Sequence, residues 1–173
     1  MSNAASPIDA PAAAGAPTQH IVLLQALGNA PARLAAELAP LGEAGAGWRP
    51  APGEWSAVET VTHLAAAEPP FLARLEHIAA EDNPFLPYFG PEVAAPDASR
   101  PLPEALADFR AGRERLLAFL AGLPPAAWHR PAVHQTLGPT TLALQVQNIL
   151  NHDREHLAQL QRTVQAWPNH AHA

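Results

Sequence analysis

The sequence contains no cysteine and no lysine. The absence of cysteine excludes disulfides, thiolate metal ligands and a cysteine nucleophile. The ten basic residues are therefore all arginines, and 16 acidic residues outnumber them, which gives a formal net charge of −6. The arginines form no basic run of the kind that binding to a phosphate backbone requires. We therefore expect no nucleic-acid partner.

Large apolar features are also scarce. Aromatic residues make up 6% of the 173 residues, so leucine, alanine and valine must build most of the core. No apolar stretch approaches the roughly 18 residues of a membrane-spanning helix, and the first residues lack the basic start and apolar run of a signal peptide. These absences predict a cytoplasmic protein with no membrane association. Residues 1–17, rich in alanine and proline, are expected to form a disordered tail.

Four segments have apolar residues at the spacing of three and four that is typical of amphipathic helices. They are residues 18–41, 56–81, 103–122 and 141–167. In the second segment, Ser56 and Glu59 form the S-x-x-E pattern of a capping box. Helices that have one apolar side each bury those sides against one another. The sequence thus predicts an all-α, up-down four-helix bundle over residues 18–167, followed by a frayed C-terminus at residues 168–173.

Proline interrupts the helical pattern in two places. Pro31 predicts a kink or a restart in the first helix. Pro69 and Pro70 predict a bend in the second helix, or a break into two shorter ones. Strand signals are weak, with residues 132–137 as the single candidate. We therefore expect four long helices with negligible sheet.

The long connection between the second and third helices, residues 83–103, contains a cluster of large apolar side chains. They are Phe85, Leu86, Tyr88 and Phe89. A solvated loop would expose them as an apolar patch. One interpretation is that they cover the end of the bundle core, and the other is that they wall a pocket or pack across a dimer. The sequence leaves both interpretations open.

His152 and His156 lie four residues apart in the fourth helix, so both rings project from one face. On a helical wheel, His156 and Asp153 fall within the apolar side and His152 lies at its flank. Burying such groups without partners is costly, and binding a metal ion through neutral imidazoles would remove that cost. An H-x-x-x-H pair alone is weak evidence, and the alternative is a pair of hydrogen-bonded polar residues within the bundle.

A metal ion would need more ligands than this pair. His63, one turn after Glu59 at the edge of the apolar stripe of the second helix, is the best-placed third ligand. Taken alone, a histidine of this kind is otherwise a core or rim residue. Glu59 and Asp153 are candidates either for orienting the imidazoles or for acting as a general base. The sequence does not separate these roles, and Asp153 is alternatively only a carboxylate on the helix surface.

Three stretches of the chain resemble the DinB-like superfamily. Trp48–Leu64 is similar to the end of its first helix and its second helix, Asn151–Leu160 to its fourth helix, and Leu137–Leu142 to the usual entry into that helix. The resemblance extends over residues 18–165. It implies a four-helix bundle with a long connection between the second and third helices. It also implies a divalent metal ion, zinc or nickel in many members, held at the positions of His63, His152 and His156.

The resemblance leaves the function open among three hypotheses. Three histidines leave metal positions free for water or substrate, which is typical of catalytic sites. The first hypothesis is therefore a metal-dependent hydrolase acting on a small molecule, or a transferase that uses a low-molecular-weight thiol as cosubstrate. The second is a non-catalytic metal- or ligand-binding helical module of stress response. The third is a helical interaction module whose metal is absent or structural. Many members are dimers, so a homodimer is also expected.

Overall fold

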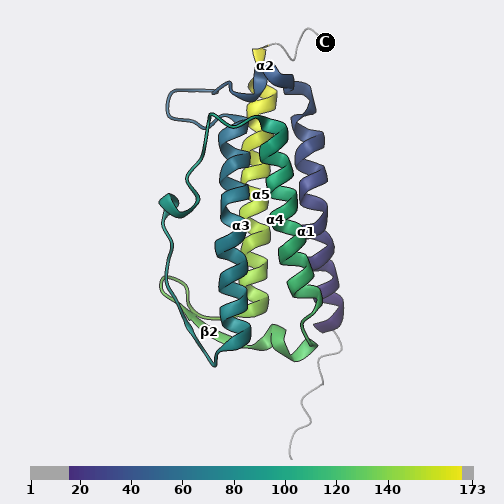
Figure 1. Ribbon diagram of the computed structural model, residues 1–173, viewed down its shortest axis with the longest axis vertical. Coiled ribbons are helices and arrows are strands. Elements are labelled where there is room, and N and C mark those ends of the chain that lie inside the picture. The colour runs from purple at the N-terminus through teal and green to yellow at the C-terminus, as the bar shows by residue number, and fades with distance from the viewer. Residues whose placement is uncertain (1–15, 169–173) are drawn as a thin grey trace, which may run out of the picture.

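The computed structural model describes residues 16–168, which are built mainly from four long helices (Figure 1). These are α1 (Ala16–Leu38), α3 (Ala57–Ala80), α4 (Leu102–Ala121) and α5 (Leu142–Ala166). The helices lie side by side in a four-helix bundle, and their ends fall close to those predicted from apolar spacing. The predicted all-α fold class is confirmed.

Shorter elements join the long helices. The helical ones are η1 (Ala39–Leu41), α2 (Gly42–Ala46), η2 (Pro91–Ala94) and η3 (Pro125–His129). The others are three strands at one end of the bundle: β1 (Phe85–Leu86), β2 (Pro131–His134) and β3 (Gly138–Thr141). In this small sheet, β2 pairs in parallel with β1 and antiparallel with β3. The weak strand candidate at residues 132–137 therefore does contribute a strand, although the sheet is minor beside the helices.

The helices α3 and α4 run in the same direction. Ala57 near the start of α3 and Ala105 near the start of α4 belong to one core cluster, whereas Leu75 and Leu116 near their ends belong to another. The predicted long connection makes this parallel arrangement possible because it runs along the length of the bundle before α4 begins (Figure 1). The other two helices, α1 and α5, run the opposite way, so the directions along the chain are up, down, down and up.

A buried ionic layer lies between the two apolar clusters of the core. Arg113 of α4 donates from Nη2 to Glu68 of α3 at 2.7 Å and from Nη1 to Asp153 of α5 at 2.7 Å. Its guanidinium is 1% exposed, and it also donates to the backbone oxygen of Leu27 in α1 at 3.0 Å. Gly112 makes this approach possible, since a Cβ there would lie 2.6 Å from the Cβ of Glu68. This layer therefore joins all four helices.

The prolines do not divide the helices. α1 continues through Pro31, and α3 continues through Pro69 and Pro70 as a single helix. Of the alternatives that the sequence offered, the restart in the first helix and the break in the second are therefore wrong, and the kink and the bend stay predictions. Each interior proline removes a backbone hydrogen bond, but α3 has buried side chains on both sides of the pair, including Glu68 and Leu75. Tertiary packing thus holds the helix together where local propensity would end it.

The predicted terminal segments fall largely outside the described residues. Of the tail expected at residues 1–17, residues 16 and 17 belong to α1, and the rest is not described. Of the frayed C-terminus expected at residues 168–173, only residue 168 is described. Within residues 16–168, none of the helices combines the length and the apolar character that crossing a bilayer demands.

Candidate metal centre

The entrance to α3 is fixed by the predicted capping box. The Ser56 hydroxyl accepts the backbone N–H of Glu59 at 3.2 Å, and the Glu59 carboxylate accepts the backbone N–H of Ser56 at 2.9 Å. Arg49 also donates to this carboxylate, at 2.9 Å from Nε. Burial raises the pKa of Glu59, but the hydrogen bonds from Ser56 and Arg49 outweigh it, so the pKa is lowered overall. The carboxylate is therefore ionised and held at the helix start.

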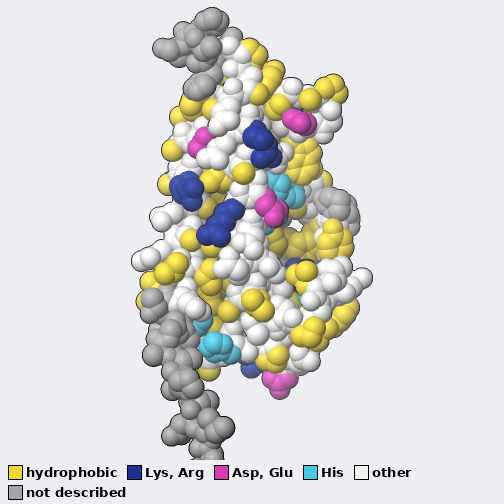
Figure 2. All heavy atoms as spheres, turned by 180° about the vertical axis from the view of Figure 1, so that it is seen from behind, with side chains coloured by type: hydrophobic (Ala, Val, Ile, Leu, Met, Phe, Trp, Pro, Cys, Tyr) yellow, Lys and Arg dark blue, Asp and Glu magenta, His cyan; other side chains and the backbone are white. Residues whose placement is uncertain are grey.

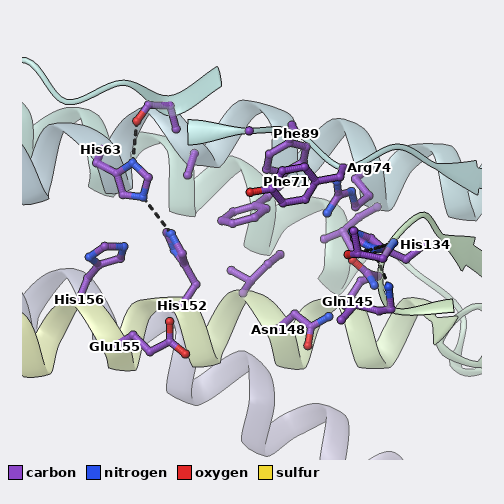
Figure 3. Close-up of a pocket in the computed structure, with 18 of the residues that line it drawn as sticks. His63, Phe71, Arg74, Phe89, His134, Gln145, Asn148, His152, Glu155 and His156 are labelled. Atoms are coloured by element: carbon purple, nitrogen blue, oxygen red, sulfur yellow. Dashed lines mark hydrogen bonds between the residues drawn. The ribbon is translucent and has the colours of Figure 1, made fainter. Parts of the chain in front are cut away.

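Three histidines from two helices converge one turn further along. His63 comes from α3, whereas His152 and His156 come from consecutive turns of α5. Each offers one ring nitrogen, and these nitrogens all lie within 4.8 Å of one another. Figure 3 shows the three rings pointing toward one another across the gap between the helices. Nitrogen ligands lie about 2.0–2.1 Å from a zinc ion, so the three nitrogens are grouped closely enough to be candidate ligands of a single ion.

Hydrogen bonds on the far side of two rings select the tautomer that metal binding needs. His63 Nδ1 lies 2.6 Å from the backbone oxygen of Ala94, and His156 Nδ1 lies 2.9 Å from the side-chain oxygen of Gln159. Because both partners are acceptors, each Nδ1 must carry a proton and each Nε2 carries the lone pair. Such outer hydrogen bonds also fix the ring orientation of metal ligands. The donor set therefore fits a divalent metal ion.

Burial favours the neutral form of His63 and His152. Burial lowers the pKa of His63, against a smaller opposing effect of the hydrogen bond to Ala94. Burial, together with the neighbouring histidines and Arg113, lowers the pKa of His152 to about 3. Aromatic rings pack against both histidines: the Trp55 ring lies 5.0 Å from the His63 ring, and the Phe71 ring lies 5.3 Å from the His152 ring, between centroids. Neutral imidazole is the form that binds metal ions.

Neither predicted carboxylate is hydrogen-bonded to the three histidines among the described residues. Glu59 bonds to Arg49 and Ser56 at the start of α3. Asp153 is 5% exposed and bonds to Arg113 in the core. The structure therefore places both in ion pairs that support the helices, and their direct role at the site stays a prediction.

A pocket of about 660 Å³ opens beside the three histidines. Most of its lining is apolar, with Trp55, Phe71 and Ile149 among the walls. Glu155, which sits on α5 between His152 and His156, is the acidic residue among the described lining residues. In Figure 2 a hollow walled largely by hydrophobic side chains opens next to a histidine and an acidic side chain. The site is therefore accessible to a small molecule.

The cluster of large apolar side chains in the long connection contributes both to the core and to a pocket wall, the two interpretations that the sequence left open. Leu86 is 1% exposed and belongs to the core, whereas Phe85 is 58% exposed. Tyr88 and Phe89 line the pocket, and the Phe89 ring lies 5.8 Å from that of Phe71. Within residues 85–89, one side chain thus packs in the core and two form part of the pocket wall.

Several lining residues were not identified from the sequence as part of the site. They are Trp55, Arg74, His134, Gln145, Asn148 and Glu155. Trp55 lies inside the Trp48–Leu64 stretch, and Glu155 lies inside the N-H-D-R-E-H-L motif, so both were within reach of motif-based reasoning. His134 reaches the pocket because its strand lies across the end of the bundle, which helical spacing does not reveal.

A four-helix bundle with a crossover connection and three convergent histidines defines a class of helical candidate metalloprotein. Residues 26–160 match the sequence model of the DinB superfamily. The chain belongs to this superfamily, as the motifs in α3 and α5 indicated.

A solved structure of another protein has a similar fold. YfiT from Bacillus subtilis is described as a probable metal-dependent hydrolase with an unusual four-helix bundle topology. The two chains superpose with a TM-score of 0.71 at 18% sequence identity, over 95% of this chain and 94% of that chain. A search of curated protein sequences gave no significant match.

Proposed function

We propose that this protein is a divalent-metal-dependent hydrolase of small molecules. The observation that carries the proposal is the convergence of His63, His152 and His156, with two of the rings held as Nδ1–H tautomers, beside an open apolar pocket. Three protein ligands leave coordination positions for water and substrate. The description of YfiT as a metal-dependent hydrolase supports the same reaction class for a chain of the same fold.

The ligand chemistry favours zinc or nickel. Imidazole suits both ions, and the chain has no thiolate to offer. When bound, such an ion would act as a Lewis acid toward a water molecule and a carbonyl oxygen. The thiol-transferase alternative has no support from the comparisons, so hydrolysis is the activity proposed.

The chain's own residues would perform the remaining steps. Trp55 and Phe71 pack against the His63 and His152 rings and shield one side of them from solvent. Glu155, the acidic residue among the described lining residues, is the candidate to accept a proton from the attacking water and to return it to the leaving group. The Ala94 and Gln159 oxygens hold the His63 and His156 rings in place during this exchange.

Elemental analysis and turnover test this function together. The purified full-length protein should contain close to one equivalent of zinc or nickel, and it should hydrolyse a chromogenic p-nitrophenyl ester faster than the chelator-treated protein does. Stoichiometric metal without turnover of any ester or amide would favour the non-catalytic ligand-binding module instead. Absence of bound metal after incubation with zinc and nickel would overturn the metal assignment. The expected homodimer stays a prediction, and light scattering during gel filtration measures it.

A further inference from the structure

The pocket has a second polar end, away from the three histidines. Figure 3 shows Arg74, His134 and Gln145 together at this end, with Phe71 and Phe89 between them and the histidines. On α3, Arg74 follows His63 by eleven residues, which is about 16 Å of helix axis at 1.5 Å per residue. On α5, Gln145 precedes His152 by seven residues, or about 10 Å. The pocket is therefore elongated, with polar groups at both ends.

Arg74 is a half-buried cation whose guanidinium donates one hydrogen bond within residues 16–168. Its guanidinium lies 4.0 Å from the centre of the Phe89 ring, and Nη2 donates to the backbone oxygen of Pro87 at 2.8 Å. The ion pairs formed among the described residues do not include Arg74. A guanidinium has five N–H donors in a planar fork that matches a carboxylate. Because burial strengthens electrostatic interactions, this cation favours an anionic ligand.

His134 presents a second donor at the same end. Its ring is 6% exposed, and Nδ1 accepts the backbone N–H groups of Thr136 at 3.2 Å and Leu137 at 3.3 Å. Since Nδ1 accepts, the proton of the neutral ring must lie on Nε2, which is then a donor. Burial lowers the pKa of His134, and the charge of Arg74 lowers it further, so the two groups lie within electrostatic reach of each other. The ring stays neutral beside the cation.

We propose that Arg74 and His134 form a subsite that binds a carboxylate of the substrate, at the end of the pocket opposite the three histidines. Resting on the proposed hydrolase function, this assigns the substrate class. It is an elongated ester or amide with an apolar middle, a scissile bond near His152 and a carboxylate about 10 Å away, which is the axial spacing between His152 and Gln145 at the far end. The apolar walls accept the middle of the molecule, and Arg74 and His134 fix its direction.

A metal-free arm tests the subsite independently of the metal centre. Binding of octanoate and of octanamide to the full-length, chelator-treated protein is measured by calorimetry at pH 8, above the pKa of free histidine near 6.5. We expect octanoate to bind about tenfold more tightly than octanamide, because a tenfold ratio corresponds to the free energy of about one hydrogen bond between charged groups. Arg74→Gln should abolish this preference, whereas Arg110→Gln, a change at an exposed arginine of α4, should keep it.

A metal-loaded arm tests the distance between the two ends. Octanohydroxamate and suberic acid monohydroxamate share a metal-binding hydroxamate, and only the second carries a distal carboxylate. With zinc present, the carboxylate should improve affinity about tenfold in the unmodified protein but not in Arg74→Gln. Arg74→Lys should retain part of the gain, since it keeps the charge without the planar fork.

The outcomes separate the two proposals. Equal binding of octanoate and octanamide to the unmodified protein would overturn the carboxylate subsite, whether or not Arg74→Gln folds. A preference that survives Arg74→Gln would overturn it as well. If neither hydroxamate binds the zinc-treated protein while octanoate keeps its preference in the first arm, the subsite stands and the metal assignment fails.

Discussion

The Nε2 atoms of His63 and His152 face each other at 3.0 Å across the interface of α3 and α5. His63 Nδ1 already carries its proton toward the Ala94 oxygen, so the proton between the two Nε2 atoms must come from His152. His152 Nδ1 is then left buried with no hydrogen-bond partner among the described residues. The position between the two Nε2 atoms can therefore hold either the proton of His152 or a metal ion, but not both at once.

Replacing any one of the three histidines by alanine should remove the metal. His152→Ala and His156→Ala each delete a ligand from α5, and His63→Ala deletes the ligand from α3. Two imidazoles hold a divalent ion much more weakly than three, so elemental analysis should find the metal content of each variant sharply reduced. His77→Ala is the matched control, because His77 is half-buried and pairs with Glu81 instead. A triple variant that purifies with stoichiometric metal would contradict the site.

Metal should be retained on acidification below the usual histidine range. Protons compete with metal only where the imidazoles can be protonated, and burial lowers the pKa of both His63 and His152. Free histidine titrates near 6.5, so we expect half of the metal to be released below pH 6. Release into a colorimetric chelator during a pH titration measures this. Loss centred at or above pH 6.5 would show that the site is more solvated than the structure indicates.

The metal-free protein should lose stability as the pH falls through the same range. The pKa of His152 is lower in the folded state than the 6.5 of an unfolded chain, so below pH 6.5 the unfolded chain binds protons that the folded chain does not. Stability from this residue is present above pH 6.5 and decreases toward its folded pKa of about 3. Urea denaturation between pH 4 and pH 8 checks it, and His152→Phe should flatten the slope.

Arg113→Met should be among the most destabilising single changes. It would leave Glu68 and Asp153 buried without their cation, and breaking a buried ion pair costs about 3–5 kcal/mol. Arg115→Met, at an exposed position of the same helix, is the control and should change the free energy of unfolding by less than about 0.5 kcal/mol. Equal midpoints in urea for the two variants would show that the ionic layer adds no stability.

Glu155→Gln should slow catalysis without releasing metal. The variant keeps the shape of the side chain but cannot accept a proton, and general base catalysis contributes about 10²–10⁴-fold to a rate. We expect kcat to fall by at least about 10²-fold, while the metal content stays unchanged. An unaltered kcat would remove Glu155 from the mechanism.

The helices and the three histidines were predictable because both are encoded locally. Apolar spacing defines each helix, and a four-residue interval alone places His152 and His156 on one face of α5. Predicting that His63 lies beside them required one further assumption, that the apolar sides of α3 and α5 face each other. The same assumption placed Asp153 toward the interior correctly, although its partner turned out to be Arg113.

The features that were not predicted depend on contacts between distant segments. The direction of α4 follows from the path of a 21-residue connection, residues 81–101, which apolar spacing does not encode. The continuity of α3 through Pro69 and Pro70 depends on packing against the other helices. Arg74 and His134 are 60 residues apart in the sequence, and only the sheet of β1 and β2 brings them to one pocket.

The buried ionic layer in the core also fixes the position of α5 along its axis relative to α4. Apolar contacts alone tolerate sliding, because leucine and alanine pack against many neighbours. A slide of α5 by one turn would move Asp153 about 5.4 Å along the helix axis and out of hydrogen-bonding distance of Arg113. Asp153 is the next residue after His152, so the bond that prevents this slide also holds His152 level with His63. The alignment of the three histidines is therefore fixed from inside the core, at a distance from the pocket.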